Sequence, residues 1–160
     1  MLLDTLLEVR DRSEALIARL EPEDLGLQGM ADASPPKWHL AHTTWFFDTF
    51  VLQPHLASHT PCDPRWSYQF NSYYETVGER HPRSERGVLS RPPVREILAW
   101  RAEVDAGLKQ LLSNEPTPEL QTLVELGLQH EQQHQELLLM DLLDGFSRQP
   151  LEPSYGIDAD

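Results

Sequence analysis

The sequence predicts an all-α fold, a bundle of four helices with a long ordered connection between the second and the third. Four stretches carry apolar residues at alternating three- and four-residue spacing, which is typical of helices with one buried face. Prolines bracket these stretches, and no segment alternates apolar and polar residues as a half-buried strand does. At 160 residues the chain is long enough to form one domain with a sizeable core.

The four helices are expected at about residues 2–20, 35–52, 94–112 and 118–143. Proline is tolerated in the first turn of a helix and disfavoured in its interior, so prolines mark both kinds of boundary. The helix starts and ends predicted in this way lie at Pro35–Pro36 and Pro92–Pro93 (starts) and at Pro22, Pro54 and Pro116 (ends).

The connection over residues 54–93 is long for a compact domain, and such loops are usually functional or disordered. Its aromatic residues favour an ordered segment with short helical pieces that packs on the bundle; they are Trp66, Tyr68, Phe70, Tyr73 and Tyr74. Residues 71–75 are expected to pack, whereas residues 81–87 resemble a polar turn. Arg83 and Arg86 in that turn suit a carboxylate substrate, or else pair with nearby glutamates at the surface.

The fourth helix carries His130 and His134 on its expected inner face. Residues four apart lie one helical turn above one another, so both imidazoles can bind one metal ion. They continue a stripe of apolar and small residues, which comprises Leu120, Leu123, Gly127, Leu137 and Asp141. Gly127, one turn earlier, is expected to leave room beside them. Glu136 lies about 200° around the helix from His134 and is expected to have a hydrogen-bonding or surface role.

His42 of the second helix is the expected third ligand, in the middle of an inward stripe with Trp38, Trp45, Thr49 and Leu52. Three histidines leave coordination positions open, which suits catalysis more than structure. Nitrogen ligands fit iron, zinc, nickel or copper equally. His39 falls at the edge of this face and is expected to support the ligands or to pack. The alternative is a core in which the histidines are satisfied without metal.

The composition excludes several classes of partner. The formal net charge of −13, with 13 Lys+Arg against 26 Asp+Glu and no basic stripe, argues against nucleic acids and anionic membranes. The dispersed acidic residues are expected on solvated helix faces. A single cysteine, Cys62, excludes an internal disulfide and is expected to be an ordinary thiol. The chain has no membrane-spanning apolar run and no signal pattern, so a cytoplasmic location is expected.

Five segments together resemble one known family, and the resemblance extends over about residues 30–151, which is most of the chain. They are residues 33–47 (ASPPKWHLAHTTWFF), 70–74 (FNSYY), 81–87 (HPRSERG), 89–92 (LSRP) and 125–139 (ELGLQHEQQHQELLL). The chain is similar to the N-terminal, DinB-like domain of the iron(II)-dependent sulfoxide synthases of ergothioneine biosynthesis. The fold implied by this resemblance is a DinB-like four-helix bundle.

The resemblance implies an iron(II) centre held by His42, His130 and His134, with zinc or nickel as substitutes in the purified protein. Members of the family use oxygen to join the sulfur of cysteine or γ-glutamylcysteine to the imidazole of trimethylhistidine, which gives a sulfoxide. The thiol is expected at the iron, with its carboxylates held by Arg83 and Arg86. Related enzymes make ovothiol or selenoneine precursors, and the motifs do not separate these substrates. No catalytic residue is assigned.

Members of the family continue into a second domain that resembles the formylglycine-generating enzyme and supplies much of the trimethylhistidine pocket. We therefore expect residues 1–160 to form one DinB-like domain with a linker-like tail at about 147–160. This domain alone is not expected to complete the reaction. Thiol and trimethylhistidine are the expected partners, and the sequence does not decide whether the chain forms a homodimer. Two other functions also stay open: a stand-alone DinB-like thiol transferase, and a metal-free helical module for interaction or dimerisation.

Overall fold

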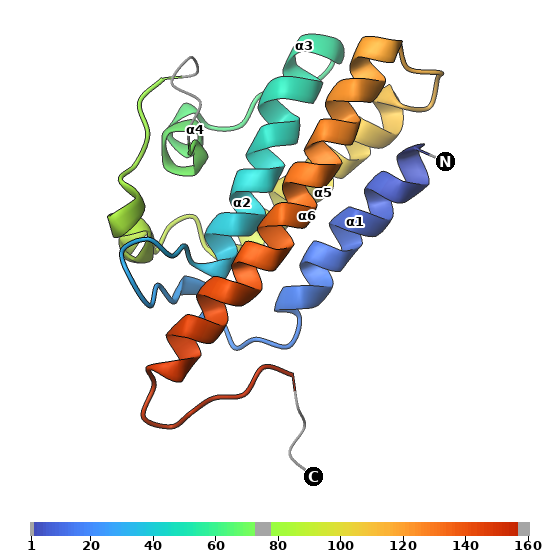
Figure 1. Ribbon diagram of the computed structural model, residues 1–160. Helices are drawn as coiled ribbons and strands as arrows, with labels where there is room; N and C mark the ends of the chain where they lie inside the picture. Colours follow the sequence, from blue (N-terminus) through green and yellow to red (C-terminus); the bar gives the residue numbers. More distant parts are fainter. Residues whose placement is uncertain (1, 73–77, 157–160) are drawn as a thin grey trace.

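The computed structural model describes residues 2–72 and 78–156, and within these ranges it contains helices and no strand. Four long helices form the bundle (Figure 1): α1 (Leu2–Ile17), α2 (Pro36–Phe46), α5 (Val94–Leu111) and α6 (Pro118–Ser147). A short 3₁₀ helix, η1 (Asp24–Gly26), lies between the first two. The all-α prediction is confirmed, and the predicted ranges of α1, α5 and α6 agree with the structure to within about one turn.

The second bundle helix continues past its predicted end. It passes from α2 into the π-helical η2 (Phe47–Leu52) and then into α3 (Gln53–His55). The helix therefore ends at His55, one residue after Pro54 and within one turn of its predicted end. Pro54 lies in the first turn of α3, directly after the wider π turns, where its missing N–H is tolerated.

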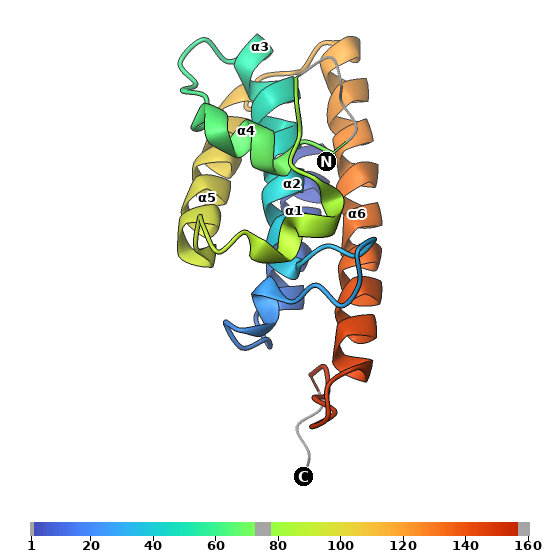
Figure 2. The ribbon, with the colours of Figure 1, turned by 90° about the vertical axis from the view of Figure 1, so that its left-hand side faces the viewer.

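Helix α2 runs through the centre of the molecule, with α5 and α6 on either side and α4 (Pro64–Phe70) across its front (Figure 2). Every residue of α2 is buried, so it has no solvated face of the kind that an amphipathic stripe predicts. The reason lies in the connection, which covers the side that the bundle leaves open. Trp38 Nε1 donates to Gln69 O (2.9 Å), and Trp45 Nε1 donates to Ser67 Oγ (3.0 Å).

The long connection is ordered and helical in part, as predicted, within the described residues. It contains α4 and the 3₁₀ helix η4 (Arg83–Val88). Asn71 and Ser72 are buried, which confirms the first part of the segment expected to pack. Tyr73, Tyr74 and Glu75 lie outside the described residues.

Gly127 permits a close approach between α6 and the start of η2. A Cβ atom added to Gly127 would lie 2.6 Å from Cε1 of Phe47 and 2.9 Å from Cε1 of Phe46. The space expected beside the histidines is thus filled by two phenylalanine rings. One of them, Phe46, lies with its ring centroid 4.9 Å from that of His130.

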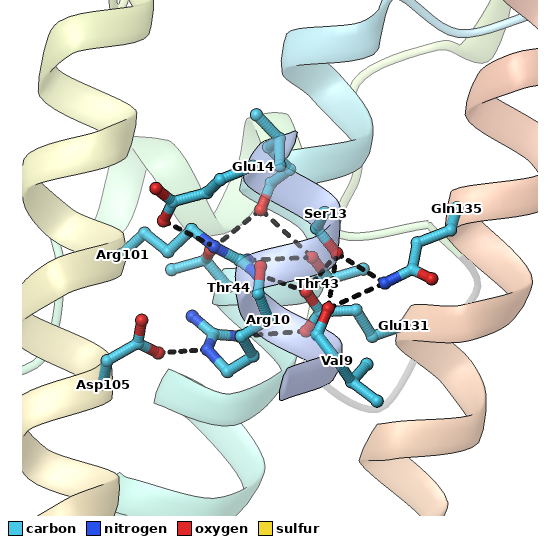
Figure 3. A network of polar contacts seen from close by, with 11 residues as sticks. Val9, Arg10, Ser13, Glu14, Thr43, Thr44, Arg101, Asp105, Glu131 and Gln135 are labelled. Carbon is cyan, nitrogen blue, oxygen red and sulfur yellow. Dashed lines mark hydrogen bonds and ion pairs between the residues drawn. The ribbon is translucent and has the colours of Figure 1, made fainter. Parts of the chain in front are cut away.

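A buried network of charged groups ties α1, α5 and α6 together (Figure 3). Glu131 is 1 % exposed and accepts hydrogen bonds from Arg10 Nη1 (3.0 Å), Ser13 Oγ (2.6 Å) and Arg101 Nη2. Arg10 also pairs with Asp105 of α5. Burial by itself would raise the pKa of the Glu131 carboxyl, but the charges of Arg101 and Arg10 and the hydrogen bonds outweigh it and lower the pKa.

For Glu131, this network corrects the expectation that the acidic residues lie on solvated helix faces. Arg10 and Arg101 are as completely buried as Glu131. A signal was present in the sequence, because the buried residues of α6 form a second stripe at three- and four-residue spacing. This stripe comprises Val124, Leu128, Glu131, Gln135, Leu138 and Leu142.

Residues 148–156 follow α6 and return to the end of α1. Tyr155 Oη donates to Leu16 O (2.8 Å), and Arg19 Nη1 donates to Gly156 O (2.9 Å). The described part of the predicted linker-like tail is therefore docked on the bundle. Among the described helices, none combines the length and the apolar character that crossing a membrane requires.

Candidate metal centre

The three histidines expected as ligands meet between α2 and α6. His42, His130 and His134 each offer one potential ligand atom, and these atoms lie within 4.8 Å of one another. The three ring centroids form a nearly regular triangle: His42 lies 4.9 Å from His130 and 4.6 Å from His134, which are 4.6 Å apart. The structure thus brings together every residue of the predicted ligand set.

The cluster lies at the margin of the core and not at its centre. The buried stripe of α6 passes through Glu131 and Gln135, and the two histidines beside it are only partly buried. His42, in contrast, is 1 % exposed, because α2 is covered on all sides. One of the three side chains is thus enclosed by protein, and the other two are partly exposed to solvent.

Backbone contact fixes the orientation of His42. Its Nδ1 lies 2.6 Å from the carbonyl oxygen of Phe70 and donates to it, so Nε2 carries the lone pair of the neutral ring. That lone pair faces His130 Nε2 at 3.1 Å. Trp38 stacks on the His42 ring, with 4.6 Å between centroids and an angle of 14° between the planes. The connection and the bundle therefore position this ligand jointly.

The cluster favours neutral imidazoles, the form that binds metal ions. Burial, followed by the charge of His130, holds the pKa of His42 well below its ordinary value. Burial lowers the pKa of His130 to about 4, and it also lowers the pKa of His134, with further contributions from His42 and His39. His130 Nδ1 is buried and has no hydrogen-bond partner among the described residues. Three neutral nitrogen donors and one unsatisfied ring atom fit a divalent transition-metal ion.

Acidification from about pH 6.5 to about pH 4 is expected to destabilise the metal-free chain. Unfolded histidine titrates near 6.5, whereas His130 in the fold titrates near 4. In this window the unfolded state binds more protons, so the free energy of unfolding falls as the pH falls. Thermal unfolding with a chelator present, measured across the window, checks this. The His130→Gln variant should show a shallower pH dependence; equal slopes for the two proteins would contradict the expectation.

His39 lies next to the cluster but outside the group of three. It is 3 % exposed, its Nδ1 is 2.9 Å from His134 Nδ1, and its Nε2 is 3.0 Å from Asp141 Oδ2. His39, which was expected at the edge of the inward face, thus contacts the proposed ligand His134 through its ring nitrogen. Glu136 is exposed on the outer side of α6.

The two arginines of the connection have different environments. Arg86 is 2 % exposed, and its guanidinium carbon lies 3.4 Å from the centre of the Trp38 ring. Its Nη1 donates to Ser34 Oγ (2.8 Å) and its Nη2 to Ser72 Oγ (3.4 Å). Arg83 is exposed and donates from Nη1 to Asp32 O (3.3 Å). Arg86 is therefore the arginine that lies close to the histidines.

Comparison with known proteins gives one match at the level of a family. Residues 5–138 match the family described as the DinB superfamily, a range that includes all three histidines and both arginines. A search of curated proteins finds no match.

Proposed function

This chain belongs to the DinB superfamily, and from that premise we propose that it is the metal-binding domain of an oxygen-dependent sulfoxide synthase. The observation that supports the proposal is the cluster of three neutral histidines at the margin of the bundle. His42, His130 and His134 would hold one divalent ion, for which we propose iron(II). Zinc or nickel would use the same nitrogen donors.

The proposed reaction joins the sulfur of cysteine or γ-glutamylcysteine to the imidazole of trimethylhistidine. This is the coupling step of ergothioneine biosynthesis, and the resemblance of the sequence implies it. One carbon–sulfur bond forms, one oxygen atom of O₂ ends on sulfur, and the other leaves as water with the thiol and imidazole hydrogens. An iron(II) ion would supply the redox and oxygen chemistry that this balance needs. The chain's own residues bind and orient the thiol.

Arg86 is the residue that we propose for the thiol's carboxylate. It lies over Trp38, whose ring stacks on His42, so its positive charge is close to the cluster. That charge contributes to the lowered pKa values of His42 and His134. The same field favours an anionic group near the histidines. Arg83, which is exposed and three residues earlier, would provide an outer contact.

The proposed function predicts that an amino-acid thiol binds only to the metal-loaded chain. Anaerobic calorimetry with γ-glutamylcysteine or cysteine on the iron(II)-loaded and the metal-free protein measures this. Equal binding to both forms, or binding to neither, would argue against the proposal. Thiol transfer to an electrophile without oxygen would instead favour the alternative of a DinB-like thiol transferase. A chain that binds no metal would favour the interaction module.

The Arg86→Gln variant is expected to bind γ-glutamylcysteine about tenfold or more weakly, because a charged hydrogen bond to the carboxylate is lost. Cysteamine, which has no carboxylate, should bind the variant as well as it binds the wild-type protein. The matched Arg83→Gln variant should show a smaller loss. If Arg86→Gln weakened both thiols equally, the arginine would support the fold and not the carboxylate.

A further inference from the structure

A series of hydrogen bonds connects Asp141, through His39, to His134 of the histidine cluster. Asp141 Oδ2 lies 3.0 Å from His39 Nε2, and His39 Nδ1 lies 2.9 Å from His134 Nδ1. The same oxygen of Asp141 accepts the backbone N–H of Ser34 at 2.8 Å. These hydrogen bonds therefore connect the segment before α2, α2 itself and α6. The sequence separates the members of this series by about a hundred residues, and the fold brings them together.

The contacts fix which atoms carry hydrogen. Because a carboxylate only accepts hydrogen bonds, Asp141 Oδ2 accepts both the backbone N–H of Ser34 and the Nε2–H of His39. A neutral imidazole has a single N–H, so Nδ1 of His39 carries a lone pair. The contact between the two Nδ1 atoms then requires His134 Nδ1 to donate. This leaves the lone pair of His134 on Nε2.

We propose that His39 and Asp141 are positioning residues that hold His134 in the tautomer protonated at Nδ1, with Nε2 as its metal-binding atom. The inference rests on the proposed metal centre, and it goes beyond it by assigning roles to two residues outside the ligand set. A histidine ligand that donates its other N–H to a fixed acceptor has a set ring orientation and a more basic donor atom. Losing such a partner typically lowers metal affinity by about 10–100-fold.

Two histidines of the cluster, His42 and His134, differ in the group that accepts their ring N–H. His42 receives the same support from the backbone carbonyl of Phe70, which no side-chain substitution removes. His134 receives it from a side chain, so its support can be deleted by mutation. Two of the three proposed ligands thus have a ring N–H tied to an acceptor.

The test combines a tautomer measurement with metal affinities. Nitrogen-15 NMR of the metal-free, histidine-labelled full chain should show His134 protonated at Nδ1 only. In His39→Leu, the Nε2-protonated form of His134 should appear, and the affinity for zinc, measured by competition with a chromophoric chelator, should fall by about 10–100-fold. In His39→Asn, an amide oxygen can accept from His134 Nδ1, and the affinity should stay within a few-fold of wild type.

Each contrary result has a distinct meaning. A wild-type His134 protonated at Nε2 would overturn the inference without any variant, even if His39→Leu failed to fold. Wild-type affinity in His39→Leu would also overturn it. A loss in His39→Leu as complete as in His134→Ala would make His39 a ligand, which contradicts a positioning role. If the wild-type chain bound no metal, the proposed metal centre would fail, whereas the NMR result would still decide the tautomer.

Discussion

Replacing Glu131 by glutamine is expected to destabilise the chain by about 3–5 kcal/mol, the usual cost of removing one partner from a buried ion pair. The carboxylate accepts from both Arg10 and Arg101, and the three side chains are at most 1 % exposed. Glutamine keeps the shape but removes the charge, so both guanidinium groups lose a buried counter-charge. Arg10 keeps Asp105, and Arg101 keeps its contact with Glu14 (3.3 Å), which limits the loss.

Urea unfolding of Glu131→Gln against wild type measures this cost. Glu136→Gln provides the matched control, because it makes the same chemical change on the exposed side of the same helix. The control should lie within about 0.5 kcal/mol of wild type. Similar stabilities for Glu131→Gln and the control would show that the buried network is not needed for the fold.

The double variant His130→Ala, His134→Ala is expected to lose its metal, with a fall in affinity far beyond the effect of any supporting residue. Only His42 of the proposed ligand set remains, and one imidazole does not retain a divalent ion against a chelator. The two histidines are partly exposed, and alanine is a strong helix former, so the helix should persist. Elemental analysis after dialysis gives the metal content, and circular dichroism checks the helix.

His55→Ala is the control for this loss, because His55 is an exposed histidine at the end of α3, away from the proposed ligand set. It should keep the wild-type metal content. If the double variant kept it as well, the ion would be held elsewhere and the three-histidine centre would be excluded.

The candidate site was predictable because its main signal is local. His130 and His134 lie four residues apart on one helix, so their common direction follows from helical geometry alone. His42 could be added because it stands among tryptophans on the inward stripe of a second apolar helix. Both inferences depend only on the period of a single helix, which the sequence contains in full.

The supporting contacts were not predictable, because each partner lies on a different element. Arg10 and Glu131 are separated by 121 residues, and His39 and Asp141 by 102. Periodicity shows which face of a helix is buried, but it does not show which charge on another helix faces it. Glu131 was therefore expected on a solvated face with the other acidic residues, although it continues a buried stripe of α6.

The complete burial of α2 was also not predictable, because it depends on contacts with other elements. Its sequence predicts one inward stripe, and the second covering layer comes from α4 and the residues around it. That packing depends on tertiary contacts such as the one from Trp38 to Gln69. The continuation of the helix past Pro54 likewise depends on the π turns of η2, for which the sequence has no simple periodic signal.

X-ray absorption at the iron edge of the iron(II)-loaded chain tests the central claim most directly. A centre built by His42, His130 and His134 predicts one iron per chain, with scattering from three imidazole rings at about 2.0–2.2 Å, the usual range for such ligands. The His130→Ala, His134→Ala variant should give no such signal. Fewer than three imidazoles on the iron, or an unchanged spectrum in the double variant, would contradict the proposed metal centre.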